Sequence, residues 1–168
     1  MAAHTLDINH WNAGLEYKEA LAKLGLRPEM LFWAYDQVLD HFVLVLATHV
    51  YDKVGPLHLS QTLFKAYTLS ATPKDIDPFA VRLHSPNQTV IRELSKMLPF
   101  NLTEGTTAQV LDKSSPPVEI NIKSAEVSLF GLECHSDWIY TFKQSKQKTT
   151  DILREWHRFN RNIEKLAA

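Results

Sequence analysis

The C-terminal segment, residues 146–166, constrains the fold more than any other part of the chain. Large apolar side chains recur there at intervals of four, three, four and three residues, namely Ile152, Trp156, Phe159, Ile163 and Leu166. Because an α-helix turns by about 100° per residue, this spacing places all five side chains on one narrow stripe. We therefore predict an amphipathic helix whose apolar stripe is covered by the core of the same chain, in preference to a second copy.

The opposite face of the same predicted helix is basic, and its members are Arg154, His157, Arg158, Arg161 and Lys165. From residue 140 to the end, seven Lys and Arg stand against three Asp and Glu, whereas residues 1–60 contain four against seven. Guanidinium groups match carboxylates and phosphates bidentately. We interpret this face first as solvent-exposed surface, second as a docking surface for an acidic partner or another subunit, and third as a nucleic-acid contact.

Turn and capping residues divide the first hundred residues into further predicted helices. Gly25 ends the first, Pro28 begins the second, and Pro99 follows the fourth, in keeping with the preference of proline for a first helical turn and of glycine for a C-terminal cap. The predicted helices cover residues 12–24, 28–51, 60–70 and 86–97. The apolar run 42–47 is too short and too closely flanked by polar residues to span a bilayer, so we expect no membrane segment.

The second half of the chain contains strand patterns. Val118, Ile120 and Ile122 alternate with polar residues, and residues 138–142 are rich in β-branched and aromatic side chains, both of which are typical of strands. We predict a small antiparallel β unit within 108–142. The expected fold is mainly α, a helical bundle-like core with this β unit, in one domain over residues 1–168, and the alternative is an all-α fold.

Cysteine and glycine usage limits the chemistry. Cys134 is the only cysteine, so no intrachain disulfide can form, and the first residues contain no basic and apolar signal segment. Both features favour a cytoplasmic protein. The five glycines form none of the nucleotide-binding or nucleophile-elbow motifs, so we expect no cofactor.

Three side chains are weak candidates for metal ligation or catalysis. His49 lies on the apolar face of the predicted helix 28–51, where we expect a core histidine with one hydrogen bond satisfied. Cys134 and His135 are adjacent within a polar run and could act as zinc ligands or as a nucleophile and base. Neighbouring side chains rarely face the same atom, and metal-ligand spacing is missing from the sequence, so we expect an ordinary turn and no metal.

The apolar run that ends near Tyr51, followed by Leu57-His58-Leu59-Ser60 and another predicted helix, resembles the all-helical HEPN domains of bacterial defence and toxin systems. That resemblance implies a ribonuclease motif of Arg and, four to six residues later, His. No arginine here has a histidine at that distance, and the nearest pair is Arg154 and His157. We therefore assign no family.

Taken together, these patterns favour a non-enzymatic helical protein that acts through a protein partner or through self-association as a homo-oligomer. The first alternative is RNA or DNA binding, or a HEPN-like component of a defence or toxin–antitoxin system. The second is a small metal- or cysteine-dependent enzyme that uses His49, Cys134 and His135.

Overall fold

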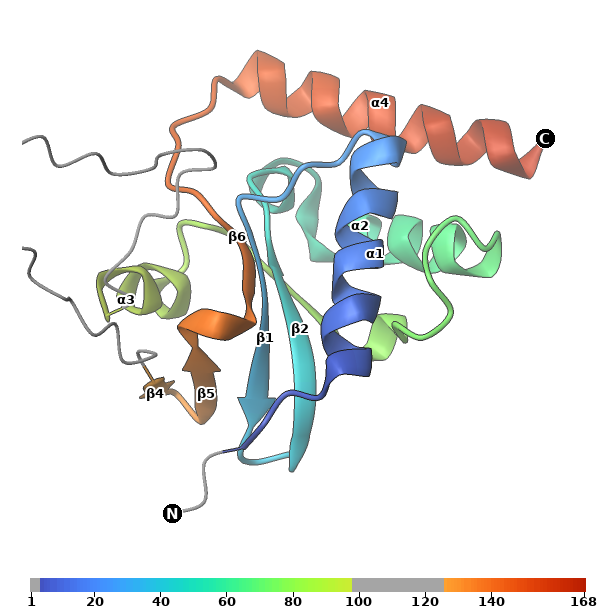
Figure 1. Ribbon diagram of the computed structural model, residues 1–168. Helices are drawn as coiled ribbons and strands as arrows, with labels where there is room; N and C mark the ends of the chain where they lie inside the picture. Colours follow the sequence, from blue (N-terminus) through green and yellow to red (C-terminus); the bar gives the residue numbers. More distant parts are fainter. Residues whose placement is uncertain (1–3, 98–125) are drawn as a thin grey trace, which may run out of the picture.

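A β-hairpin forms the centre of the molecule. In the computed structural model, which describes residues 4–97 and 126–168, β1 (Met30–Asp36) pairs antiparallel with β2 (His41–Ala47) over their whole length. The hairpin takes up most of the segment 28–51, which we predicted as one helix (Figure 1). That prediction is wrong. Both strands carry continuous apolar runs, and periodicity alone does not distinguish such a buried strand from a buried helix.

The turn of this hairpin is closed by a side chain. The carboxylate of Asp36 accepts hydrogen bonds from the amides of Val38 and Leu39, at 2.8 and 2.9 Å. Asp40 then adopts a left-handed conformation with φ 58°, which aspartate tolerates better than most residues. The chain therefore reverses direction without a glycine or a proline.

Four further strands complete a six-stranded sheet in the order β3-β2-β1-β5-β4, with β6 also paired to β1. Antiparallel pairs predominate, but β3 runs parallel to β2 because a helix connects them. One edge of β1 is shared, since β6 pairs with its first half and β5 with its last two residues. The bounds are β3 Val81–His84, β4 Glu126–Leu129, β5 Leu132–His135 and β6 Ile139–Phe142.

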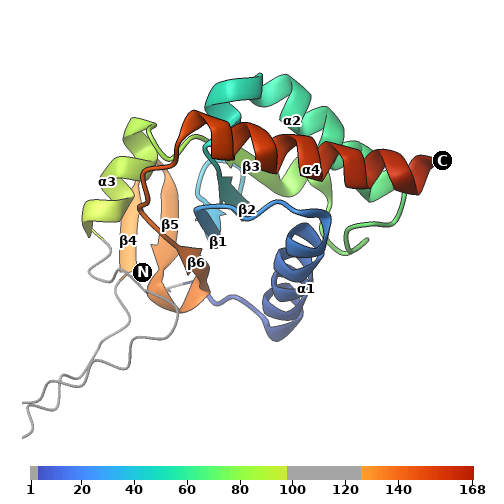
Figure 2. The same cartoon turned by 90° about the horizontal axis from the view of Figure 1, so that it is seen from above.

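Helices cover both faces of the sheet. Helix α3 (Thr89–Met97) lies on one face, and α1 (Ile8–Leu24), α2 (Val50–Thr68) and α4 (Thr149–Ala167) lie on the other (Figure 2). Two 3₁₀ turns, Pro78–Ala80 and Ser136–Trp138, precede β3 and β6. Helix α1 starts at the N-cap Asp7 and ends at Gly25, whose φ of 96° suits a glycine C-cap.

Helix α2 contains a break at Gly55, which lies between the predicted helices 28–51 and 60–70. Gly55 has φ 82° and ψ 160°, outside helical geometry, and Pro56 starts the second piece. Proline fits there because its missing amide proton is not needed in a first helical turn. The predicted helix 60–70 lies within and just beyond this second piece.

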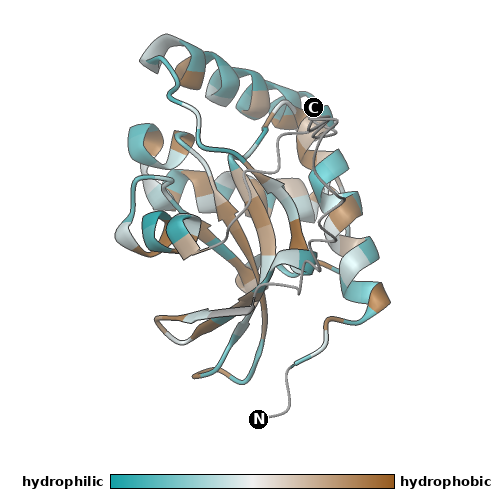
Figure 3. Cartoon of the chain, turned by 60° about the vertical axis from the view of Figure 1, so that its left-hand side comes forward, coloured by the Kyte–Doolittle hydropathy of each residue, from teal (hydrophilic) through white to brown (hydrophobic). Residues whose placement is uncertain are grey.

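Alternate residues of β1 face the two layers. Leu31, Trp33 and Tyr35 pack with α1, α2 and α4, whereas Met30 and Phe32 pack with α3. All seven residues of β1 are buried, and Figure 3 shows the strands as the most apolar part of the chain. The sheet therefore has an apolar core on each side.

The apolar stripe of the C-terminal helix packs on the core of the same chain. Ile152, Phe159 and Ile163 are buried beside residues of α1 and α2, Trp156 is half-buried, and Leu166 is 55% exposed. The amide of Asn162 also donates to the carbonyl of Leu24, at 2.9 Å. The central part of the stripe is therefore unavailable to a second copy.

These observations correct the expected fold class. The protein has a mixed α/β fold with a six-stranded mixed sheet, and both the mainly α prediction and its all-α alternative are wrong. The resemblance to all-helical HEPN domains is not supported, because the fold contains a sheet and the apolar run on which the resemblance partly rested forms β2. Strands β4 to β6 lie within the predicted β unit, while the pattern at 118–122 falls outside the described residues.

None of the helices in the two described ranges has the length and apolarity needed to cross a bilayer.

A candidate anion-binding crevice

The parallel strands β2 and β3 end at the same edge of the sheet. Helix α2 begins at Val50, directly after β2, and α3 begins at Thr89, soon after β3. In α/β sheets this edge is the usual place for a ligand, because chain turns and helix N-termini gather there. The N-terminal ends of both helices also carry partial positive charge.

A crevice of about 340 Å³ opens at this edge, between α3 and residues 143–148, which we call the linker. The linker connects β6 to α4 and runs above α3 in Figure 1. Four cationic side chains line the crevice, and they are Arg92, Lys96, Lys143 and Lys146. His49, at the start of α2, and Asn87, from the loop before α3, also line it. The charged groups described in the lining are therefore mainly basic.

Helix α3 holds two of these cations on one face. Arg92 and Lys96 are separated by one helical turn, so they project on the same side, while Ile91 and Leu94 are buried against the sheet. Lys96 also forms an ion pair with Glu93 at 2.6 Å. Both partners are largely exposed, and such pairs contribute little and exchange readily with a ligand.

The linker is fixed to the start of β1 by the carboxylate of Glu29. Ser145 donates to it through its amide, at 3.2 Å, and its hydroxyl, at 2.9 to 3.0 Å, and Gln147 donates through its side-chain amide at 3.0 Å. The ring Nε2 of His49 lies 2.9 Å from the carbonyl of Ser145. A carbonyl can only accept, so Nε2 carries the proton. These contacts hold the linker in place, while the side chains of Lys143 and Lys146 remain exposed.

The charge balance of the crevice favours anions. Among the described residues, Glu29 is the one carboxylate that lines it, and only 4% of Glu29 is exposed. Its oxygens are already engaged by Ser145 and Gln147. A ligand entering from solvent therefore meets the four cations first, and charge-assisted hydrogen bonds from these groups are strong.

The basic residues predicted on the C-terminal helix lie outside this crevice. Arg154, His157, Arg158, Arg161 and Lys165 are all exposed on α4. Arg154 lies 3.7 Å from Asp151 in a pair that is mostly in solvent. The structure thus leaves this face accessible, and it does not place the face against the four crevice cations.

His49 is separated from Cys134 and His135. His49 lines the crevice at the start of α2, where it is half-buried, so the prediction of a core histidine within a helix 28–51 is wrong. Cys134 and His135 lie on β5, which pairs with the opposite end of β1, so the expected turn at these two residues is a strand. Cys134 is fully buried, and burial, together with the charge of Glu133, raises the pKa of its thiol to about 12. In residues 4–97 and 126–168, no group of three or more His, Cys, Asp or Glu side chains is placed to hold a metal ion.

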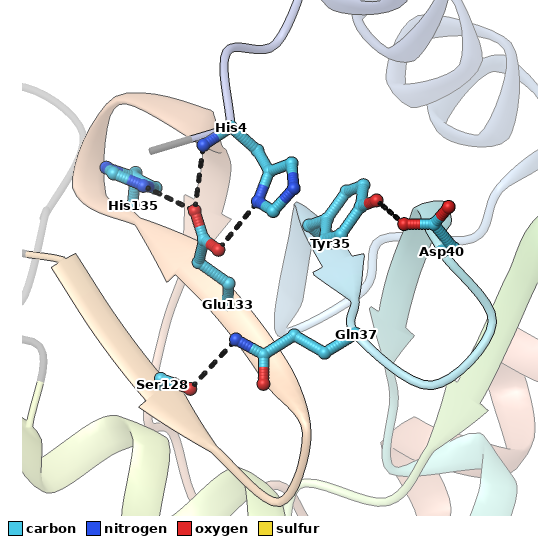
Figure 4. Close-up of polar contacts among 7 residues, drawn as sticks. All are labelled: His4, Tyr35, Gln37, Asp40, Ser128, Glu133 and His135. Atoms are coloured by element: carbon cyan, nitrogen blue, oxygen red, sulfur yellow. Dashed lines mark hydrogen bonds and ion pairs between the residues drawn. The ribbon is translucent and has the colours of Figure 1, made fainter. Parts of the chain in front are cut away.

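A second polar cluster surrounds Glu133 (Figure 4). Its carboxylate accepts from the amide of His4 at 3.3 Å and contacts the imidazole Nδ1 of His4 at 2.8 Å and Nε2 of His135 at 3.3 Å. The ring of His4 stacks on Tyr35 with centroids 3.5 Å apart, and the Tyr35 hydroxyl donates to Asp40. Burial alone would raise the pKa of Glu133, but its hydrogen bonds to the two histidines lower it overall. The cluster fastens the N-terminal segment to β5.

Sequence reasoning did not single out the four crevice cations. Lys143 and Lys146 belong to the run Lys143-Gln-Ser-Lys146-Gln-Lys148 between a strand and a helix. A basic run beside the end of a strand is the one sequence pattern that could have pointed to these two lysines as anion-binding residues. Arg92 and Lys96 lie about fifty residues earlier, and the pairing of β6 with β1 together with the packing of α3 on the sheet brings the two sets together. No family model, curated protein or solved structure matches this chain.

Proposed function

We propose that the protein binds a phosphate-bearing ligand in the crevice between α3 and the linker. The convergence of Arg92, Lys96, Lys143 and Lys146 on one hollow carries the proposal. The single carboxylate in the described part of its lining, Glu29, is buried and hydrogen-bonded. Four positive charges suit a ligand with several negative charges, and guanidinium and ammonium groups are the usual phosphate donors in proteins.

The position of the crevice supports the same conclusion. Helices α2 and α3 both begin at this edge of the sheet, and the partial positive charge at helix N-termini favours a bound phosphate. The linker contributes two lysines from a segment that Glu29 holds in a defined place. A preorganised set of cations binds an anion more tightly, because less conformational entropy is lost on binding.

The role proposed is the binding of an anionic ligand. Self-association through the apolar stripe of α4 has lost its basis, because Ile152, Phe159 and Ile163 are buried within the same chain.

Isothermal titration calorimetry with sodium pyrophosphate tests the proposal, with sodium chloride of equal ionic strength as the reference titration. We expect saturable heat with pyrophosphate alone. Arg92→Gln and Lys146→Gln should each weaken binding about threefold to tenfold, the range for losing one solvent-accessible charge-assisted hydrogen bond.

Lys23→Gln is the matched control, because Lys23 is an exposed lysine on α1 whose charged neighbours are Glu16 and Glu19. It should leave the affinity for pyrophosphate unchanged. The proposal is wrong if Arg92→Gln and Lys146→Gln bind pyrophosphate as tightly as the Lys23→Gln control, or if chloride produces the same heat.

A further inference from the structure

We infer that the phosphate-bearing ligand is the backbone of a double-stranded nucleic acid, bound along a basic surface that extends from the crevice to α4. This inference rests on the proposed function, since the crevice forms one end of that surface. The first observation is a second hollow of about 240 Å³, lined by Lys18, Arg27 and Lys143. Lys143 lines both hollows, so the two are adjacent.

The second hollow is as basic as the first. Its described lining includes three cations and no carboxylate. Arg27 is exposed, and its backbone amide donates to the carboxylate of Glu155, on α4, at 2.9 Å. Glu155 is half-buried and also interacts electrostatically with Arg27 and Arg158, so one carboxylate lies beside these two arginines. A ligand that fills the crevice can continue past Lys143 towards Arg27 without meeting a carboxylate in the described lining of the second hollow.

The surface continues from Arg27 onto α4. A Cβ built on Gly25 would lie 3.0 Å from Cδ of Arg158, so the side chain of Arg158 runs directly over this glycine, two residues from Arg27. Gly25 has φ 96° as the C-cap of α1, and its lack of a side chain leaves room for the arginine. We call Arg92, Lys96, Lys146, Lys143, Arg27 and Arg158 the basic band.

The extent of the basic band favours a polymer over a small ligand. Its members come from α3, the linker, the α1–β1 connection and α4, and the crevice alone would suffice for one or two phosphate groups. Duplex nucleic acid carries a negative charge about every 1.7 Å of its axis, and proteins bind it through rows of Lys and Arg. The formal net charge of the chain is −1, and acids predominate in residues 1–60. The positive charge of the band is therefore balanced by acids elsewhere in the chain.

The chemistry of the lining distinguishes a duplex from two other polyanions. None of the large apolar side chains exposed in the described ranges lines either hollow. An acidic protein partner would normally need an apolar or aromatic centre in its interface. Single-stranded nucleic acid would normally need aromatic side chains for base stacking, and neither hollow has a Phe, Tyr or Trp side chain in its described lining. A duplex backbone needs neither.

Fluorescence anisotropy with a labelled 20-base-pair DNA duplex, and an RNA duplex of the same sequence, tests the inference. Affinity should be independent of sequence and should fall steeply with salt, with a log–log slope of about −4 for four to five phosphate contacts. Arg27→Gln and Arg158→Gln should each weaken duplex binding about threefold to tenfold and reduce the slope by about one. They should leave pyrophosphate binding unchanged, whereas Arg92→Gln should weaken both. Lys23→Gln is again the matched control.

The outcomes separate the two proposals. If pyrophosphate binds in the crevice but Arg27→Gln and Arg158→Gln do not affect duplex binding, the inference is overturned and the proposed function stands. If poly-glutamate, or a single-stranded oligonucleotide of the same length, binds as tightly as the duplex and responds to the same variants, the assignment to a duplex is overturned. If neither pyrophosphate nor duplex binds, both proposals fail.

Discussion

The carboxylate of Glu29 accepts hydrogen bonds from both the amide and the hydroxyl of Ser145, a residue 116 positions later in the chain. A hydroxyl donates only one proton, so its distances to the two carboxylate oxygens describe one shared hydrogen bond. The contact fixes the linker to the start of the central strand. It thereby sets where Lys143 and Lys146 stand at the crevice.

Removing Glu29 should therefore cost more stability than removing one of its donors. Glu29→Ala leaves the Ser145 amide and the Gln147 side chain without their acceptor, and we expect the free energy of unfolding to fall by about 2–3 kcal/mol. Ser145→Ala removes only the hydroxyl and should cost about 1 kcal/mol. Urea denaturation measures both values, and equal losses would show that Glu29 does not hold the linker as described.

Gly14 is the point at which α1 meets β6. A Cβ at this position would overlap the side chain of Tyr140, whose hydroxyl accepts from the Trp33 indole at 2.9 Å and donates to the Trp11 carbonyl at 2.6 Å. Alanine favours a helix over glycine by about 1 kcal/mol, but overpacking and the lost hydrogen bonds should outweigh this gain. We expect Gly14→Ala to lower the free energy of unfolding by about 2 kcal/mol.

A double-mutant cycle isolates the cause of that loss. In a Tyr140→Ala background the obstacle is gone, so Gly14→Ala should become neutral or stabilising by up to about 1 kcal/mol. An unchanged destabilisation in that background would mean that Gly14 is needed for another reason.

Cys134 offers a chemical probe of native-state opening. Burial and the neighbouring charge of Glu133 raise the pKa of its thiol to about 12, so the reactive thiolate is scarce at pH 8. We expect Ellman's reagent to label the native protein only through unfolding and to label it at once in 8 M urea. Because Cys134 is the only cysteine, the signal is specific, and rapid labelling without urea would contradict its burial.

The C-terminal helix was within reach of sequence reasoning, and the hairpin was not. Helix α4 is exposed on one side, so its apolar residues recur with a helical period. Strand β1 is buried at every position, which removes the alternation that identifies a strand. The turn after it has neither glycine nor proline. The remaining signal was the aromatic and β-branched content of both strands, including Phe32, Trp33 and Val45.

The crevice was beyond sequence reasoning for a different reason. Arg92 and Lys143 are brought together by the pairing of β6 with β1 and by the packing of α3 on the sheet. Such long-range pairing is set by the register of strands distant in sequence. The excess of Lys and Arg after residue 140 indicated a basic region, but it could not indicate which earlier residues would join it.

Asp36 should make the protein sensitive to acid. Burial alone would raise its pKa, but hydrogen bonds from the amides of Leu39 and Val38, and the guanidinium of Arg82, lower it overall. Its stabilising effect is therefore complete above the ordinary carboxyl pKa of about 3.9 and is lost as the pH falls through the lower folded-state value. Asp36→Asn should flatten this part of the stability curve between pH 5 and pH 2, measured by thermal denaturation. If the stability of Asp36→Asn falls with pH as steeply as that of the wild type, another group causes the acid response.

His84 should act in a separate, higher pH range. Burial lowers the pKa of its imidazole, more than the hydrogen bond with Gln88 raises it. The unfolded chain therefore takes up a proton first, and stability should begin to fall as the pH drops below about 6.5, the ordinary histidine pKa. His84→Asn can still donate to Gln88 and should remove the decline between pH 7 and pH 5. Persistence of that decline in His84→Asn would point to another histidine.

The shared edge of β1 also bears on how the chain reaches its native state during synthesis. Strands β5 and β6 and helix α4 all come from the last third of the chain, yet they cover the strand and the α1–α2 surface made first. Until the ribosome has released those segments, one side of the hairpin lacks its neighbours, and the apolar faces of α1 and α2 lack the cover of α4. Premature termination before α4 should therefore yield a product that chaperones retain and proteases clear, whereas the completed chain escapes both.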